Sequence, residues 1–135
     1  MVKRPLIYII DDDQIVLLLH KLQVTKQQLS EQLLVFSDPK IALESILSLP
    51  NENQRLLIFL DINMPEMNGW EFLELLEKQN LHVDIKVILV TSSLSISDKK
   101  KATESDLVID FWEKPMEPVN VIQLKDQLGD WLLGK

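Results

Sequence analysis

Five side chains that can do chemistry follow apolar, strand-like segments of this 135-residue chain. Asp61 ends the apolar run from Leu56 to Leu60 and precedes a Pro and an Asn-Gly pair. Alone, such an aspartate would cap a strand or a turn. The other four are Asp11 and Asp12 after the first apolar run, Thr91 after the fourth, and Lys114, which Pro115 follows. Carboxylates, a hydroxyl and an ammonium would suit a hard cation and an anion, provided that the fold brings them together.

Short apolar runs alternate with helical patterns along the chain, which is typical of βα units and a mainly parallel sheet. We expect strands at Leu6–Ile10, Leu33–Phe36, Leu56–Leu60, Ile85–Val90 and Leu107–Phe111. We expect helices from Gln14 to about Gln28, from Pro39 to near Pro50, from about Gly69 to Gln79, from Asp98 to Glu104 with Ser97 as its cap, and from about Pro118 to Leu133. With right-handed crossovers, the pattern predicts an α/β fold with a doubly wound five-stranded parallel sheet and five helices in a three-layer sandwich.

In such a sheet the carboxyl ends of the strands open on one edge, where Asp11, Asp12 and Asp61 would meet between the first and third strands. Carboxylates that close repel each other unless one is protonated or a cation lies among them. An all-oxygen set favours Mg²⁺. Thr91 and Lys114 add donors that a metal site alone does not need, so an anion is expected as well.

The anion most consistent with this set is a phosphoryl group, whose transfer needs an in-line nucleophile, a metal and donors for its oxygens. The chain has no cysteine, and its two histidines, His20 on the first helix and His82 before the fourth strand, belong to no nucleophilic set. A carboxylate can itself attack and form an acyl phosphate. Asp61, central in the site and on the most buried strand, is the best nucleophile.

The bulk composition limits the possible functions. A chain of 135 residues is about one domain, so we expect residues 1–135 to form a single domain without room for a second. The lack of cysteine excludes thiolate chemistry and Cys-based zinc sites, and the net charge of −7 argues against direct binding to nucleic acid. No signal-peptide core or membrane span is present, so we expect a soluble, cytoplasmic protein.

Four segments carry a resemblance to a known family: IIDDD, FLDINMPEMNGWEFL, VILVTSS and FWEKP. In order and approximate spacing, the sequence resembles the response-regulator receiver domains of bacterial two-component signalling, of the stand-alone chemotaxis type. The resemblance covers essentially the whole chain. It implies a flavodoxin-like sandwich with the strand order 2-1-3-4-5.

Residue by residue, the resemblance implies that Asp61 is the phosphate acceptor. Asp12 would bind Mg²⁺ directly, Asp11 mostly through water, and Asn63 through its backbone carbonyl. Lys114 would contact the phosphoryl group and the unphosphorylated carboxylate.

The same resemblance implies a switch. Thr91 would move toward the new phosphate, and Phe111 would turn inward into the vacated space, although a phenylalanine at a strand end is by itself a core residue. Pro115 would follow a cis peptide bond. Asp13 matches no ligand position, so we expect it to be solvated or to lie at the first helix's N-terminus.

The resemblance also implies partners. A sensor histidine kinase or a histidine phosphotransfer protein would supply the phosphate, and a downstream protein target would respond to the surface change, without direct nucleic acid or membrane binding. The protein would catalyse only its own phosphorylation and dephosphorylation. One alternative is a receiver-like binding module that takes no phosphate. Another is a small phosphohydrolase, but Asn63 stands where its acid/base carboxylate would be, two residues after Asp61.

Two features keep two interpretations each. The first helix is apolar on nearly every side, since Val16 and Leu17 add to a set that includes Ile15, Leu18, Leu19 and Leu22. This breadth indicates either deep burial or, as in the family, a docking surface for the phosphodonor. Trp112 is either exposed near the output face or packed in the core.

Overall fold

The computed structural model describes residues 4–50, 54–79, 81, 83–92 and 95–133, so His82 lies outside the described residues. Five parallel strands form one sheet in the order β2-β1-β3-β4-β5. They are β1 (Leu6–Ile10), β2 (Leu33–Phe36), β3 (Arg55–Leu60), β4 (Asp84–Thr91) and β5 (Val108–Glu113). The predicted doubly wound sheet and its strand order are confirmed.

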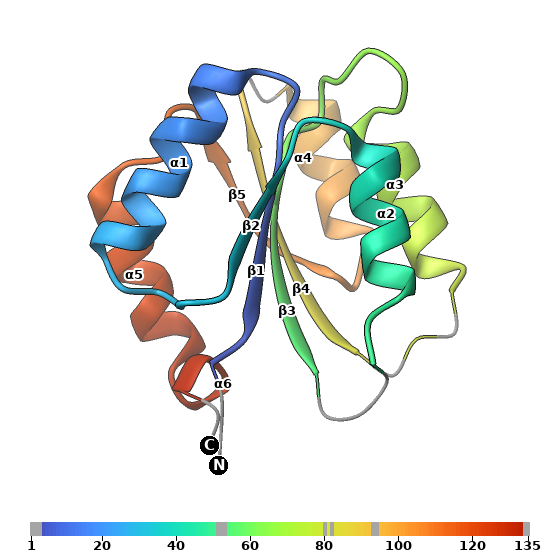
Figure 1. Ribbon diagram of the computed structural model, residues 1–135. Helices are drawn as coiled ribbons and strands as arrows, with labels where there is room; N and C mark the ends of the chain where they lie inside the picture. Colours follow the sequence, from blue (N-terminus) through green and yellow to red (C-terminus); the bar gives the residue numbers. More distant parts are fainter. Residues whose placement is uncertain (1–3, 51–53, 80, 82, 93–94, 134–135) are drawn as a thin grey trace.

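Helices cover both faces of the sheet and make the three layers (Figure 1). They are α1 (Gln14–Lys26), α2 (Pro39–Leu47), α3 (Gly69–Glu77), α4 (Ile96–Thr103), α5 (Pro118–Leu128) and the single turn α6 (Asp130–Leu133). In Figure 1, α1 and α5 lie on one side of the sheet and α2, α3 and α4 on the other. In the described part of the chain, no helix has the length and apolar composition needed to cross a membrane.

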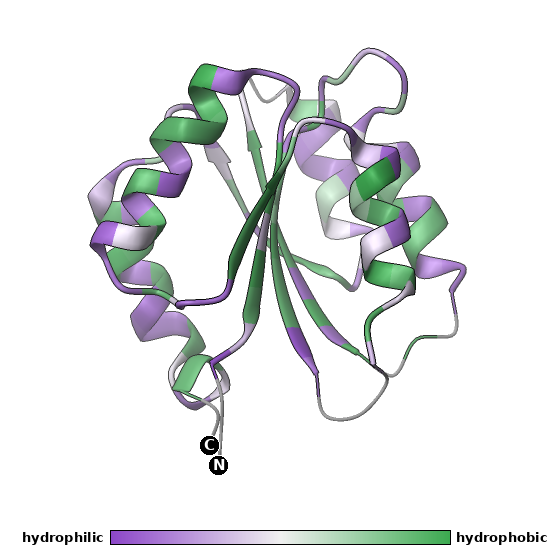
Figure 2. Ribbon diagram, in the orientation of Figure 1, coloured by the Kyte–Doolittle hydropathy of each residue, from purple (hydrophilic) through white to green (hydrophobic). Residues whose placement is uncertain are grey.

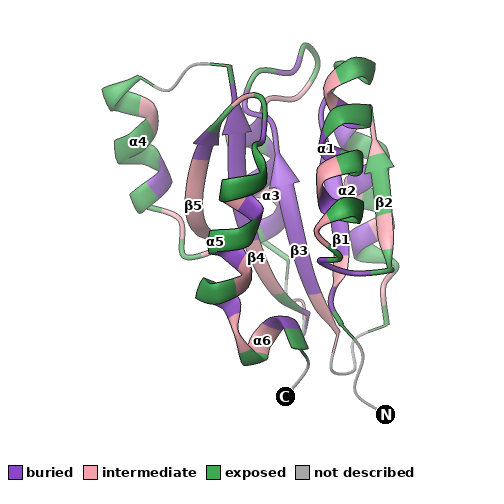
Figure 3. Cartoon of the chain, turned by 90° about the vertical axis from the view of Figure 1, so that its left-hand side faces the viewer, coloured by how far each residue is buried: buried purple, intermediate pink, exposed green. Residues whose placement is uncertain are grey.

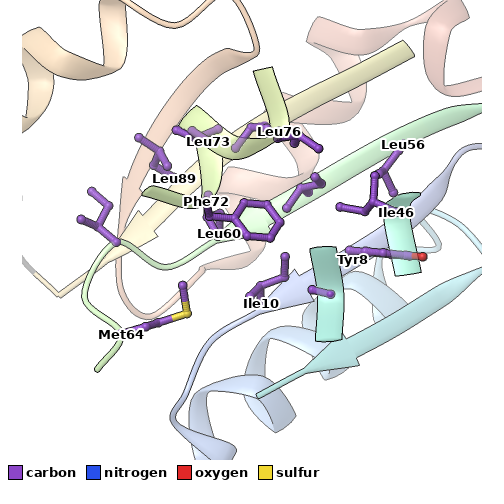
Figure 4. Close-up of a cluster of buried hydrophobic side chains, with 14 of the residues drawn as sticks. Tyr8, Ile10, Ile46, Leu56, Leu60, Met64, Phe72, Leu73, Leu76 and Leu89 are labelled. Atoms are coloured by element: carbon purple, nitrogen blue, oxygen red, sulfur yellow. The ribbon is translucent and has the colours of Figure 1, made fainter. Parts of the chain in front are cut away.

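Each face of the sheet has its own hydrophobic core, because successive strand residues point to opposite faces. Ile58 and Leu60 belong to the core beneath α2 and α3, whereas Leu57 and Phe59 belong to the core beneath α1 and α5. The middle strands are hydrophobic over most of their length (Figure 2) and buried, while the edge strand β2 is exposed or half-buried (Figure 3). Figure 4 shows the first core, where Phe72 of α3 packs over the sheet.

The predicted cap of the charged helix is wrong. Helix α4 begins at Ile96, and its N-cap is Ser95 rather than Ser97. The Ser95 hydroxyl accepts the Asp98 N–H at 3.0 Å, and the Asp98 carboxylate accepts the Ser95 N–H at 3.2 Å. This reciprocal pair satisfies two backbone donors at once, which explains why Ser95 is preferred.

The predicted last helix is broken at Gly129. Helix α5 ends at Leu128, and Gly129 has φ +49°, a conformation that is easy only for glycine, before α6 begins. Strand β5 runs from Val108 to Glu113 rather than from Leu107 to Phe111, with a bulge opposite the step between Val87 and Ile88. The other boundaries agree with the predictions within three residues.

The face of α1 that packs against the sheet is not the one that carries the longest row of apolar residues. Leu17, His20 and Val24 are the buried residues of α1. The row that includes Ile15 and Leu18 faces solvent, with exposed fractions of 70% and 58% for these two side chains. The breadth of the apolar pattern therefore reflects an exposed hydrophobic surface and not deep burial.

Replacement of Ser95 by alanine tests the α4 cap. Ser95→Ala should lower the free energy of unfolding by about 1 kcal/mol, because the Asp98 N–H loses its acceptor. Ser97→Ala is the matched control and should change it by less than about 0.5 kcal/mol, since Ser97 is exposed inside the helix. Urea denaturation measures both, and equal losses would contradict the assignment.

Candidate functional site

Three backbone hydrogen bonds carry the strand ladders one residue beyond the carboxyl ends of the strands. The Asp11 N–H donates to the Phe36 carbonyl at 3.1 Å, and the Asp61 N–H donates to the Ile10 carbonyl at 3.0 Å. The Lys114 N–H donates to the Thr91 carbonyl at 2.8 Å. These bonds fix the backbone of Asp11, Asp61 and Lys114 at one edge of the sheet.

The side chains of these residues meet at that edge. The Lys114 Nζ lies 2.6 Å from an Asp11 carboxylate oxygen and 3.2 Å from Asp61 Oδ1. Both aspartates are buried, with exposed fractions of 2% each. Asp12 is exposed, but it offers an oxygen that lies with those of Asp11 and Asp61 within 4.8 Å of one another. The convergence of these four predicted residues is therefore observed.

Burial dominates the ionisation of the two buried aspartates. It raises the pKa of Asp61 to about 6, with a further rise from the Asp11 carboxylate and an opposing effect from Lys114. Burial also raises the pKa of Asp11, against the hydrogen bond from Lys114. For Lys114, burial favours the neutral amine, but the hydrogen bond and charge of Asp11, followed by those of Asp61, raise its pKa. The single ammonium group of Lys114 thus forms ion pairs with two buried carboxyl groups.

The donor set fits a hard divalent cation. Asp11, Asp12 and Asp61 supply three carboxylates, whereas Lys114 supplies a single positive charge beside two of them. Mg²⁺ prefers oxygen ligands, and it is commonly held by a few carboxylates while it keeps several waters, which this set allows.

Asn63 connects Asp61 with Thr91. Its backbone N–H donates to Asp61 Oδ1 at 3.2 Å, and its side-chain amide donates to the Thr91 hydroxyl, also at 3.2 Å. Thr91 is fully buried. Its hydroxyl therefore has a hydrogen-bond partner, and Asn63 links it to the Asp61 carboxylate.

Gly69 gives the loop after Asp61 its close packing. A Cβ added at Gly69 would lie 2.7 Å from the Asp61 carbonyl oxygen and 2.9 Å from the Ile62 Cα, both backbone atoms. The Gly69 N–H donates to the Ile62 carbonyl at 2.8 Å. The start of α3 thus rests directly on the backbone of Asp61, with room only for glycine.

The two aromatic residues of β5 point to opposite faces. Phe111 is half-buried against the core beneath α2 and α3, and it pairs with Leu89, two residues before Thr91, so Phe111 and Thr91 share a face. Trp112 is buried in the other core, with its ring centroid 5.6 Å from that of Phe59. The packed alternative for Trp112 is therefore the observed one.

Two smaller predictions are confirmed. Asp13 is the N-cap of α1, where its carboxylate accepts the N–H groups of Ile15 and Val16. The peptide bond between Lys114 and Pro115 is cis. His20, for which no role was expected, is buried, and its Nε2 accepts the Met116 N–H at 3.1 Å. The sequence signal for its burial was its helical spacing from Leu17 and Val24, which lie on the same buried face of α1.

A family model described as the response regulator receiver domain matches residues 7–125. The chain belongs to this family. Receiver domains are signalling phosphoacceptors rather than enzymes, and they bind Mg²⁺ at an acidic pocket, which here corresponds to the cluster of Asp11, Asp12 and Asp61. The resemblance found in the four sequence segments is confirmed.

Over 78 residues this receiver domain is 37% identical to the cyclic di-GMP phosphodiesterase response regulator RpfG of Xanthomonas campestris pv. campestris (strain 8004). That match covers 53% of this chain and 20% of the relative, so it spans about a fifth of the relative's length.

Solved structures share the fold. A two-component response regulator from Cytophaga hutchinsonii is 26% identical with a TM-score of 0.78, over 93% of this chain and 97% of that chain. A two-component response regulator from Legionella pneumophila is 28% identical with a TM-score of 0.76, over 93% of this chain and 98% of that one. The similarity therefore extends over nearly the whole fold.

The raised pKa of Asp61 predicts a dependence of stability on pH. Because the folded state holds this proton up to about pH 6 and an unperturbed aspartate loses it near 3.8, stability falls as pH rises between these values. Asp61→Asn removes the effect, so without divalent metal the variant should be more stable than the wild type at pH 7 by about 1–3 kcal/mol. The difference should shrink toward pH 4.

Urea denaturation in EDTA at pH 4 and pH 7 measures this difference. A variant that is equally or less stable than the wild type at pH 7 would contradict the prediction.

Proposed function

We propose that this receiver domain accepts a phosphoryl group on Asp61 and signals through the resulting change of its surface. The observation that carries the proposal is the contact of the Lys114 ammonium with both Asp11 and Asp61, at 2.6 and 3.2 Å, within the acidic cluster at the strand ends. An ammonium in this place lowers the repulsion between an attacking carboxylate and an anionic phosphoryl group.

Asp61 is the nucleophile in this proposal. One of its carboxylate oxygens forms a bond to phosphorus while the P–N bond of a phosphohistidine breaks. The electron pair stays on the ring nitrogen, and a phosphohistidine protonated on its other nitrogen leaves as a neutral imidazole. Lys114 then pairs with a phosphoryl oxygen. Attack of water on phosphorus returns inorganic phosphate and the Asp61 carboxylate.

Asp11, Asp12 and Asp61, with the backbone carbonyl of Asn63, are the groups that would hold Mg²⁺. When bound, the ion supplies positive charge for the phosphoryl oxygens. The excess of carboxylates over the single Lys114 ammonium supports this part of the proposal.

The position of Thr91 supports a switch as part of this proposal. Its hydroxyl accepts a hydrogen bond from Asn63 in this state, and a phosphoryl group on Asp61 would offer oxygens to which it can donate. Movement of Thr91 would open space on the face of the sheet that it shares with half-buried Phe111. An inward turn of Phe111 would then change the surface of α4 and β5 for a downstream protein target.

The exposed apolar row of α1 supports docking of the phosphodonor there. The row starts just after Asp12 and Asp13, next to the acidic cluster, and comprises Ile15, Leu18, Leu19 and Leu22. A hydrophobic surface beside the nucleophile suits a helical partner that carries the phosphohistidine. We propose that this partner is a sensor histidine kinase or a histidine phosphotransfer protein. We therefore also propose that the protein is cytoplasmic.

The net charge of −7 supports a protein target rather than nucleic acid. The alternative function is that of a binding module. Such a module would have the same fold but would accept no phosphoryl group. Labelling with acetyl phosphate distinguishes the two functions.

Incubation with acetyl phosphate and Mg²⁺ should add the mass of one phosphoryl group to the wild-type protein, as seen by intact mass spectrometry. Asp61→Asn should abolish the gain, because the nucleophile is lost. The matched control is Asp13→Asn, in which the amide oxygen can still cap α1. It should label like the wild type.

Equal labelling of Asp61→Asn would move the acceptor to another residue and contradict the assignment. Absence of labelling in all three proteins would support the binding module.

Calorimetric titration with Mg²⁺ tests the metal ligands. Asp12→Asn should weaken Mg²⁺ binding about tenfold or more, since a carboxylate ligand is replaced by a neutral amide. Asp13→Asn removes the same charge from the next position, where the carboxylate caps α1, and should bind nearly as the wild type does. Equal weakening in both variants would indicate long-range attraction instead of ligation.

A further inference from the structure

His20 is a buried titratable side chain that the proposed function does not use. It is 1% exposed and lies on the face of α1 that packs against the sheet, in one row with Leu17 and Val24. A polar ring in an apolar row needs a hydrogen-bond partner, because an unpaired buried polar group is unfavourable. That partner connects His20 to the loop that carries Lys114.

The partner is the backbone of the loop between β5 and α5. His20 Nε2 accepts the N–H of Met116 at 3.1 Å, and Met116 is itself buried in the core beneath α1 and α5. Since Nε2 accepts, the ring is neutral and carries its proton on Nδ1. Burial, followed by the charge of Lys114, lowers the pKa of His20 to about 4, which agrees with a neutral ring.

The same loop carries Lys114. At one end, the Lys114 N–H donates to the Thr91 carbonyl at 2.8 Å; two residues later, the Met116 N–H is held by His20. Pro115 between them has no N–H to donate. The backbone on either side of the Lys114 side chain is thus attached to β4 and to α1, while its ammonium reaches Asp11 and Asp61.

We propose that His20 is a positioning residue for Lys114: by accepting the Met116 N–H, it sets the place of the ammonium between Asp11 and Asp61 and thereby the rate of phosphoryl transfer. This inference rests on the proposed function. The competing view is that His20 only stabilises the fold, and the two views differ in what a variant does to the rate in the folded protein.

The first test compares two replacements of His20. His20→Leu keeps an apolar side chain but offers no acceptor, so the initial rate of labelling by saturating acetyl phosphate should fall about tenfold, as expected when a catalytic group is slightly misplaced. The Kd for Mg²⁺ should change far less than the rate, because the carboxylate ligands themselves are untouched. His20→Gln offers an amide oxygen to the Met116 N–H and should restore most of the rate.

The matched control is Val24→Ala, which creates a cavity in the same buried row, one helical turn after His20. It should lower stability without changing the labelling rate of the folded protein. A second control uses the Lys114→Ala background, where His20→Leu should cause no further loss because the side chain it positions is gone. A further tenfold loss there, or wild-type labelling by His20→Leu, would overturn the proposal.

If His20→Leu does not fold, the wild-type protein still provides a test. NMR of the ¹⁵N-labelled chain should show His20 with its proton on Nδ1 and none on Nε2 at neutral pH. A proton on Nε2 would overturn the proposal, because that nitrogen could not accept the Met116 N–H. A wild-type protein that takes no phosphate from acetyl phosphate would instead refute the proposed function.

Discussion

Two buried carboxyl groups, those of Asp11 and Asp61, depend on one ammonium, that of Lys114. Burial raises the pKa of both carboxyl groups, while the two carboxylates raise the pKa of Lys114. The three side chains therefore hold each other in place but leave an excess of negative potential, to which the exposed Asp12 adds. Such a site would attract a divalent cation, and the proposed phosphoryl transfer would need both that ion and a lysine that receives an anion.

The fold maintains this arrangement mainly through its backbone. Each of the three residues donates its N–H to the neighbouring strand, one position beyond the ladder. Gly69 allows the start of α3 to rest on the Asp61 carbonyl, where any side chain would collide with backbone atoms. On the remaining side, the loop after Lys114 is held by α1 through His20. Charged side chains that repel one another are thus carried on segments with little freedom to move apart.

The sequence predicted the core of the site because parallel strands end at a common edge whatever the details of their packing. Asp61 and Lys114 directly follow their strands, so small errors in strand limits did not matter. The inward face of α1 was harder to predict, since apolar residues surround that helix almost completely and periodicity could not select one side. The role of His20 depends on Met116, which is 96 positions away, and no local pattern reports such a contact. The α4 cap was in principle predictable, because the residue three positions after Ser95 is acidic.

The most direct test of the central claim is chemical identification of the phosphorylated atom. After labelling with acetyl phosphate and Mg²⁺, borohydride reduction converts an acyl phosphate on aspartate into homoserine, which peptide mass spectrometry can locate. We predict homoserine at position 61, and its absence when Mg²⁺ is omitted. Homoserine at Asp11 or Asp12 with aspartate intact at position 61 would contradict the account.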